Sequence, residues 1–119
     1  MALPILEITL KSGIKMAAEL VVLSIGVGAN GKLAKDAGLT LNARGGIVTD
    51  EHQRTSDPHI YAVGDVAQVQ DYIFKEPVMV PLAGPANKQA RVAANNLAGG
   101  NDAYRGTQAT AIAKVFDER

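Results

Sequence analysis

The N-terminal part of the chain carries two hydrophobic patterns, and both are typical of strands. In residues 6–10 every second side chain is apolar, and the alternation resumes at Ile14 and Met16 after a Lys-Ser-Gly turn. A period of two is typical of a strand with one covered face, so these residues predict a β-hairpin. Residues 20–25 (LVVLSI) are almost continuously apolar, which predicts a strand covered on both faces.

The middle of the chain consists of shorter segments. Residues 32–37 predict a short helix that ends at Gly38. The brief apolar stretches 47–49 and 60–63 predict two strands. The second of these runs directly into a Gly-Asp pair, so that pair should lie at the carboxyl end of a strand.

The clearest helix pattern covers residues 85–98. Pro85 suits the first helical position, and two glycines follow residue 98 as a stop signal. Its apolar positions at helical spacing are Ala86, Ala90, Ala93, Ala94 and Leu97. We therefore expect this helix to pack closely through a face of alanines. Residues 111–116 predict one more strand, and the mixture of helices and strands predicts an α/β protein.

Composition excludes several classes of function. The 119 residues form one domain at most, and twelve basic residues balance twelve acidic ones without a basic cluster. We therefore expect no nucleic-acid partner. No apolar stretch is long enough to span a bilayer, and the N-terminus lacks a secretory-signal pattern, so we expect a cytoplasmic protein without membrane contact.

Reactive side chains are scarce. The chain has no cysteine, which excludes thiolate metal sites and cysteine nucleophiles. His52 and His59 lie in polar, loop-like sequence, where we expect surface residues. We therefore predict no metal site and no catalytic acid, base or nucleophile in this chain.

Residues 26–31 match G-x-G-x-x-G after an apolar run, and Asp50 follows about twenty residues later, as in a dinucleotide-binding fingerprint. That fingerprint needs a long helix whose N-terminus faces the pyrophosphate. Here the helical pattern ends at Gly38. We favour a glycine-rich crossing between domains.

The most specific pattern is TSDPHIYAVGD at residues 55–65. Gly64 would let a ligand approach the backbone, and Asp65 would place a carboxylate at the edge where open α/β sheets bind ligands. An isolated Gly-Asp pair would indicate only a turn. The whole string resembles the T-x-x-x-x-I-Y-A-x-G-D signature of pyridine nucleotide-disulfide oxidoreductase flavoproteins. The resemblance implies that Gly64 and Asp65 bind FAD, with Asp65 on the ribityl chain.

Residues 80–89 (VPLAGPANKQ) resemble the segment of that family that brings a helix N-terminus to the pyrimidine edge of the flavin. Negative charge of reduced flavin near N1 and O2 is stabilised by the positive end of a helix. The resemblance implies that the backbone near Ala83 contacts the flavin and that Pro81 lies beside the nicotinamide. An ordinary helix that begins with proline is the alternative for this segment alone.

Residues 19–30 resemble the strand and turn that leave the NAD(P)H domain, which would place Gly26 near the nicotinamide. Glu19 and Ala29 stand where the family usually has Asp and Pro. The resemblance extends from Leu6 to Phe116. The sequence PLAGPANKQ at residues 81–89 is most similar to the coenzyme A-disulfide reductase, NADH oxidase and persulfide reductase branch.

This resemblance implies a partial FAD/NAD(P)-binding, Rossmann-like fold with a β-hairpin or meander portion. Residues 1–30 would end the NAD(P)H-binding domain, residues 31–112 would form the C-terminal half of the FAD domain, and residues 113–119 would begin a dimerisation domain. A whole enzyme of this kind transfers hydride from NAD(P)H to FAD and onward to a small-molecule disulfide, a persulfide, or an oxygen or peroxide acceptor.

The family's glycine-rich phosphate loop and redox-active cysteine have no counterpart in this sequence. We therefore expect the chain alone to be inactive and to lose FAD. The alternative is a non-catalytic, self-associating binding module. In either case we expect a homo-oligomer, because unpaired strand edges recruit other strands and the net charge is zero.

Overall fold

The computed structural model describes residues 5–110 and residue 112. Its elements are β1 (Leu6–Thr9), β2 (Lys15–Ala18), α1 (Lys32–Asp36), β3 (Ile47–Val48), β4 (Ala67–Gln70), β5 (Pro77–Val78) and α2 (Ala83–Leu97). The molecule is elongated, with extents of 61 × 37 × 31 Å. Its radius of gyration of 19.5 Å exceeds the roughly 13.5 Å of a compact chain of this length.

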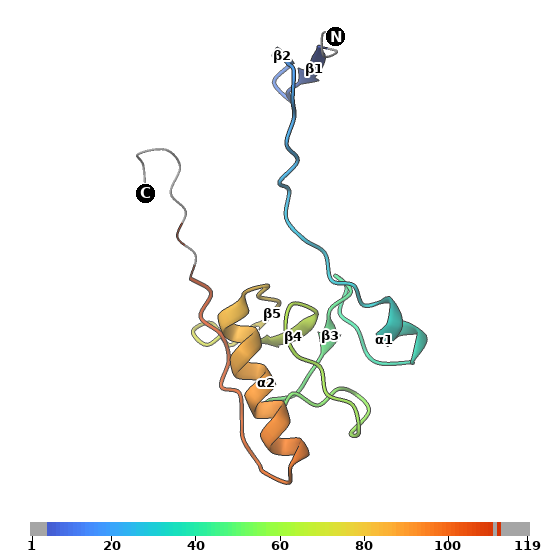
Figure 1. The fold of residues 1–119 in the computed structure, drawn as a ribbon, viewed down its shortest axis with the longest axis vertical. Coiled ribbons are helices and arrows are strands. Elements are labelled where there is room, and N and C mark those ends of the chain that lie inside the picture. Colours follow the sequence, from blue (N-terminus) through green and yellow to red (C-terminus); the bar gives the residue numbers. More distant parts are fainter. Residues whose placement is uncertain (1–4, 111, 113–119) are drawn as a thin grey trace.

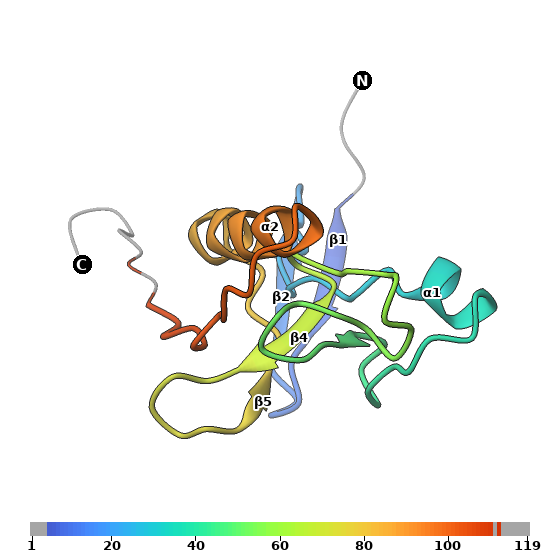
Figure 2. The same cartoon turned by 90° about the horizontal axis from the view of Figure 1, so that it is seen from below.

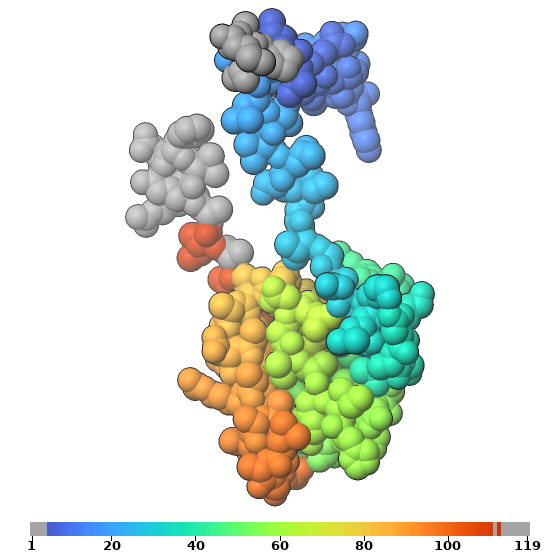
Figure 3. Space-filling view, turned by 45° about the vertical axis from the view of Figure 1, so that its right-hand side comes forward, coloured from blue at the N-terminus to red at the C-terminus, as the bar shows by residue number. Residues whose placement is uncertain are grey.

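Two regions produce this shape. We call residues 31–107 the body and residues 5–30 the arm. Figures 1 and 3 show the arm standing away from the body, with the hairpin at its far end. In the arm, β1 and β2 pair antiparallel, with Leu6 opposite Ala18 and Thr9 opposite Lys15. The predicted hairpin is therefore confirmed.

The strand predicted at residues 20–25 is wrong. The structure has no regular element there, and Leu23 and Ile25 are 79% and 88% exposed. A strand needs a neighbour to take its backbone hydrogen bonds, and the described residues provide none beside this segment. The segment is instead an extended linker between hairpin and body (Figure 1).

The body holds a small mixed sheet in the order β3-β4-β5. β3 and β4 are parallel, and β4 and β5 are antiparallel. Figures 1 and 2 show α2 alongside β4 and β5, and α1 at the other side of the body. The core consists mainly of small side chains, including Ala67, Val69, Val80 and Ala93, all of which are buried.

The predicted strand at residues 60–63 is also wrong. Only Tyr61 forms a bridge, to Arg54, and the regular strand β4 begins after the Gly-Asp pair. Residues 60–63 have no second neighbour among the described residues with which to continue a ladder. The Tyr61 hydroxyl also accepts a hydrogen bond from Arg54 Nε at 3.3 Å, which raises the pKa of Arg54.

The predicted long helix is confirmed, but its buried face agrees with the predicted one only at Ala93 and in part at Ala86. α2 begins at Ala83, so Pro85 lies inside the first turn, where its missing N–H costs no helical bond. The buried residues of α2 are Gln89, Ala93 and Asn96, whereas the predicted Ala90, Ala94 and Leu97 are exposed. The Gln89 and Asn96 side chains face the body because they accept hydrogen bonds from the N–H groups of Gly64 and Asp102.

The remaining predictions have mixed outcomes. The short helix α1 and the strand β3 are confirmed. His59 is exposed as expected, but His52 is half-buried, with Nδ1 2.8 Å from the Asp102 carbonyl oxygen. The strand predicted at 111–116 lies outside the described residues, apart from residue 112. Within the described part of the chain, no helix is both long and apolar enough to cross a membrane.

Candidate functional site

One cavity collects three of the five predicted site residues. Gly26, Asp65 and Pro81 line a space of about 250 Å³. Its other lining residues are Val27, Gly28, Ala29, Arg44 and Met79. Gly26 comes from the arm, and the other two come from separate segments of the body. Gly64 directly precedes Asp65, while Ala83 is the first residue of α2 and does not line the cavity.

The geometry of Gly64 explains why glycine occupies this position. Its φ is +84°, in the left-handed region that side chains rarely adopt. Its N–H donates to Gln89 Oε1 at 2.7 Å, and Gln89 is only 1% exposed. A side chain of α2 therefore fixes the turn that carries Asp65, whose own side chain is exposed and free to meet a ligand.

The sequence analysis did not predict a role for Gln89, which it placed only at the end of residues 80–89, the segment that starts the helix. A polar residue on an otherwise small-residue helix face is the signal that could have found it. Buried polar side chains need partners, so such a residue points to a backbone group that the helix must satisfy.

The N-terminus of α2 has no side-chain cap. Its N-cap residue is Leu82, with φ −134° and ψ 138°, and its first turn holds no acidic residue. A Cβ at Gly84 would meet nothing within 4 Å, so the space beside this turn is open. The N–H groups of Ala83 and Gly84 precede the first intrahelical bonds. They offer two donors and the positive end of the helix dipole to an external acceptor.

The glycine-rich segment 26–31 does not form a dinucleotide fingerprint. The helix that follows it, α1, has only five residues. A Cβ at Gly31 would overlap the Gly45 carbonyl oxygen, so this glycine is required for backbone-to-backbone packing inside the body. The segment therefore serves to attach the arm to the body.

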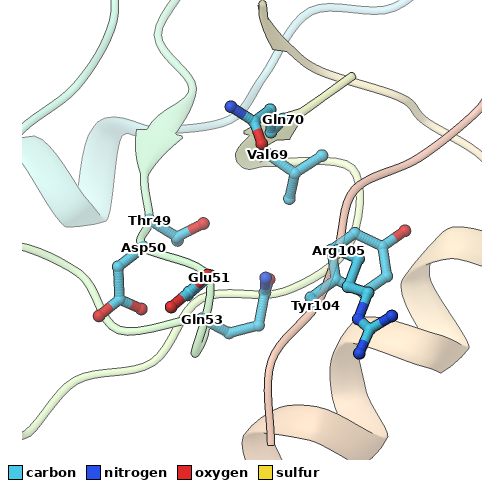
Figure 4. Close-up of a pocket in the computed structure, with 8 residues that line it drawn as sticks. All are labelled: Thr49, Asp50, Glu51, Gln53, Val69, Gln70, Tyr104 and Arg105. Atoms are coloured by element: carbon cyan, nitrogen blue, oxygen red, sulfur yellow. The ribbon is translucent and has the colours of Figure 1, made fainter. Parts of the chain in front are cut away.

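A second cavity, of about 340 Å³, lies between the loop after β3, the end of β4 and the segment that follows α2 (Figure 4). Its lining residues are Thr49, Asp50, Glu51, Gln53, Val69, Gln70, Tyr104 and Arg105. Gln53 is 1% exposed, has a φ of +66°, and its Oε1 has no hydrogen-bond partner among the described residues. Sequence reasoning did not identify Gln53.

This second cavity offers no reactive arrangement. Asp50 Oδ1 is already occupied by the N–H groups of His52 and Arg54, each at 2.8 Å. Figure 4 shows the Asp50 carboxylate and the Arg105 guanidinium on opposite sides of the cavity, not directed toward each other. None of the predicted site residues lines it. In the described part of the chain, no group of three His, Cys, Asp or Glu side chains could hold a metal ion.

Comparison with known proteins agrees with the pattern around Gly64. The family model described as pyridine nucleotide-disulphide oxidoreductase matches residues 4–95. The NAD(P)H coenzyme A polysulfide/persulfide reductase of Pyrococcus horikoshii is 41% identical over 100 residues, which are 84% of this chain and 22% of that protein. The coenzyme A disulfide reductase of Staphylococcus aureus is 34% identical over 113 residues, which are 93% of this chain and 26% of that protein.

Solved structures show the same relationship. The structure of reduced Bacillus anthracis CoADR-RHD matches with a TM-score of 0.86 and 46% sequence identity, over 93% of this chain and 20% of that chain. The chain therefore spans only a fifth to a quarter of these three relatives, between 20% and 26% of their length. It belongs to the pyridine nucleotide-disulphide oxidoreductase family, within the branch of coenzyme A-disulfide reductases, NADH oxidases and persulfide reductases.

Proposed function

We propose that this chain is the part of an FAD-dependent NAD(P)H oxidoreductase that lies against the flavin and the nicotinamide. The observation that carries the proposal is the cavity shared by Gly26, Asp65 and Pro81, which are far apart in the sequence. The residues present suit the cofactor. An exposed carboxylate can accept hydrogen bonds from ribityl hydroxyls, and the uncapped N-terminus of α2 can donate to an electron-rich ring edge.

Each residue has a binding role. Gly64, Asp65 and the backbone at Ala83 would hold FAD, while Pro81 and Gly26 would lie beside the nicotinamide. Bound FAD supplies the redox chemistry by accepting hydride from NAD(P)H. The residues of this chain would orient the two rings and keep them in place; none of them is proposed to transfer a proton or to attack a substrate.

The whole enzyme would pass its electrons to a disulfide, a persulfide, or oxygen or peroxide. Named relatives act on coenzyme A disulfide and on coenzyme A polysulfide or persulfide. A redox-active thiol would have to come from other polypeptide, because this sequence has no cysteine. We therefore propose that the chain by itself is inactive. A cytoplasmic location and the division at residues 30 and 112 remain part of this proposal.

A chimera tests the cofactor role. In it, this chain replaces the matching fifth of Bacillus anthracis CoADR-RHD, with which it shares 46% sequence identity. The purified chimera should carry flavin, measured by visible absorbance. Asp65→Ala should lower the FAD affinity about tenfold or more, because the lost acceptor bonds are charge-assisted. Asp36→Ala, at another exposed carboxylate, is the matched control and should leave the flavin content unchanged.

The isolated chain gives the complementary result. It should be colourless after purification, because contacts from the rest of an FAD site are absent, at a cost on the order of a thousandfold in affinity. Stoichiometric flavin in this preparation would contradict our proposal that the chain alone lacks a complete site. A folded chimera in which Asp65→Ala leaves the FAD affinity unchanged would contradict the role of Asp65.

A second candidate function is a non-catalytic, self-associating module. The exposed apolar linker favours it, since Leu20, Val22 and Leu23 are each 79% exposed. Two copies could pair their linkers as strands and so satisfy both sets of backbone groups. Light scattering separates this candidate from a monomer: a mass of 12.4 kDa that does not change with concentration would exclude it.

A further inference from the structure

Arg44 shares the cavity with the proposed cofactor residues. It lines the same space as Asp65, Pro81 and the glycine-rich residues 26–29. Arg44 and Asp65 are the only charged residues that line this cavity. Nothing in the sequence pattern marked Arg44.

The turn that carries Arg44 is held firmly in place. The Asn42 side chain accepts hydrogen bonds from the N–H groups of Arg44 and Gly46, each at 2.9 Å. Its Nδ2 donates to Gln68 Oε1 at 2.8 Å and approaches Met79 Sδ at 3.4 Å. One side chain therefore ties the turn to β4 and to the segment that leads to Pro81. Arg44 is consequently presented at a fixed place on the cavity wall.

No salt bridge among residues 5–110 neutralises the charge of Arg44. The salt bridges of the described residues join Lys15 to Glu7, Lys32 to Asp36 and His52 to Glu51. None of them involves Arg44 or Asp65, and Arg44 itself is exposed. The guanidinium of Arg44 thus has no carboxylate partner among the described residues, and it lies beside the glycine-rich backbone of residues 26–29. Such a guanidinium is suited to bind a phosphate group.

The two charged residues are complementary to the two kinds of polar group in a nucleotide. A carboxylate accepts hydrogen bonds from sugar or ribityl hydroxyls, and a guanidinium donates to phosphate oxygens. These groups lie a few bonds apart in any phosphorylated ribose or ribityl chain. The cavity is large enough for such a unit and too small for a whole dinucleotide.

We propose that Arg44 binds a phosphate group of a dinucleotide in this cavity and thereby fixes the cofactor relative to Asp65. This inference rests on the proposed function and adds a residue to it. FAD and NAD(P)H both carry phosphates of this kind, so the shared chemistry is a phosphate next to a polyhydroxyl chain.

Amide NMR titration of the full 119-residue chain tests the proposal with two pairs of ligands. FMN and riboflavin differ by one phosphate, as do nicotinamide mononucleotide and nicotinamide riboside. The phosphorylated member of at least one pair should bind about tenfold more tightly than its partner, with shifts at Arg44 and Gly26. The pair that shows the difference identifies which cofactor supplies the phosphate.

Three variants of the cavity and one control variant complete the design. Arg44→Ala should remove the preference for the phosphorylated ligand, and Arg44→Lys should keep part of it because a positive charge remains. Asp65→Asn should weaken binding of the phosphate-free member, because the side chain accepts fewer hydrogen bonds from hydroxyls, and should keep the preference for the phosphorylated member. The amide spectrum itself shows whether each variant is folded, and Arg91→Ala on the exposed face of α2 controls for the loss of a positive charge.

The outcomes separate the two claims. Equal binding of phosphorylated and phosphate-free ligands, or an unchanged preference in folded Arg44→Ala, would overturn the role of Arg44 while leaving the flavin site intact. If 1 M salt failed to reduce the phosphate preference, the role would be overturned too, because screening weakens exposed ion pairs. The proposed function itself is tested by the chimera: a folded chimera that carries no flavin, together with no shift near Gly64 or Gly26 at millimolar concentrations of any of the four ligands, would overturn it.

Discussion

The body and the arm carry similar hydrophobic patterns, but their apolar side chains are buried in the body and exposed in the arm. In the body, Ala67 and Val69 are 1% and 6% exposed; in the arm, Leu23 and Ile25 are 79% and 88% exposed. The β4 side chains are buried because two further strands and α2 lie next to β4. The linker of the arm has no such neighbour among the described residues. An apolar run therefore specifies a strand only where another segment can take its hydrogen bonds and cover its side chains.

In the body, α2 is also attached to the neighbouring segments by buried polar side chains rather than by large apolar ones. Gln89 and Asn96 are both buried on the inner face of α2 and are both hydrogen-bonded to backbone. The arm has no equivalent, since its Lys15–Glu7 pair is exposed and so contributes little to stability. This difference can be tested by mutation.

The largest effect is expected for Asn96→Ala. The Asn96 side chain bonds Asp102 N at 2.7 Å, Asp102 O at 2.9 Å and His52 O at 3.2 Å. Its removal leaves a space at a buried position and deprives the part-buried Asp102 N–H and His52 carbonyl of this partner, at a cost of about 3 kcal/mol in the free energy of unfolding. Urea denaturation of the body measures this loss. Asn95→Ala removes a single exposed hydrogen bond, to Asp102 Oδ2, and should cost about 0.5 kcal/mol or less. Equal losses in the two variants would contradict the structural role of the buried Asn96 side chain.

A smaller loss is expected for Gln89→Ala, which removes the acceptor of the Gly64 N–H. One unsatisfied buried donor costs about 2 kcal/mol. The amide signals of Gly64 and Asp65 should also shift more than those of β3, because the turn loses its anchor. Lys88→Ala serves as the matched control on the exposed side of the same helix. Unchanged Gly64 signals would show that Gln89 does not position this turn.

The third prediction concerns the arm. If exposed linkers pair between copies, Leu23→Asp combined with Ile25→Asp should weaken self-association about tenfold or more, since buried carboxylates are costly. Light scattering across a concentration series measures the change. Ser12→Asp combined with Asn101→Asp adds the same charge at other exposed sites and should have little effect. Equal effects of the two double variants would attribute the change to net charge alone. The stability of the body should stay the same in both.

Local sequence signals predicted several elements because their causes are local. Gly38 ends α1 with a φ of +76°, and the glycine after Ala98 ends α2 with a φ of +90°. The alternation in residues 6–10 needs only a turn and its own return strand, so the hairpin formed as predicted. The signature around Gly64 was also readable, because its residues are contiguous in the chain.

The sequence by itself thus determined the family, the hairpin, the helices and the turn at Gly64, whose φ is +84°. Only the tertiary structure decided which face of α2 is buried, that residues 60–63 form no strand, and that Arg44 lies in the same cavity as Asp65. The physical reason is the same in each case. Spacing along the chain records which side chains could share a face, whereas burial, pairing and convergence depend on which distant segments are present to pack against them.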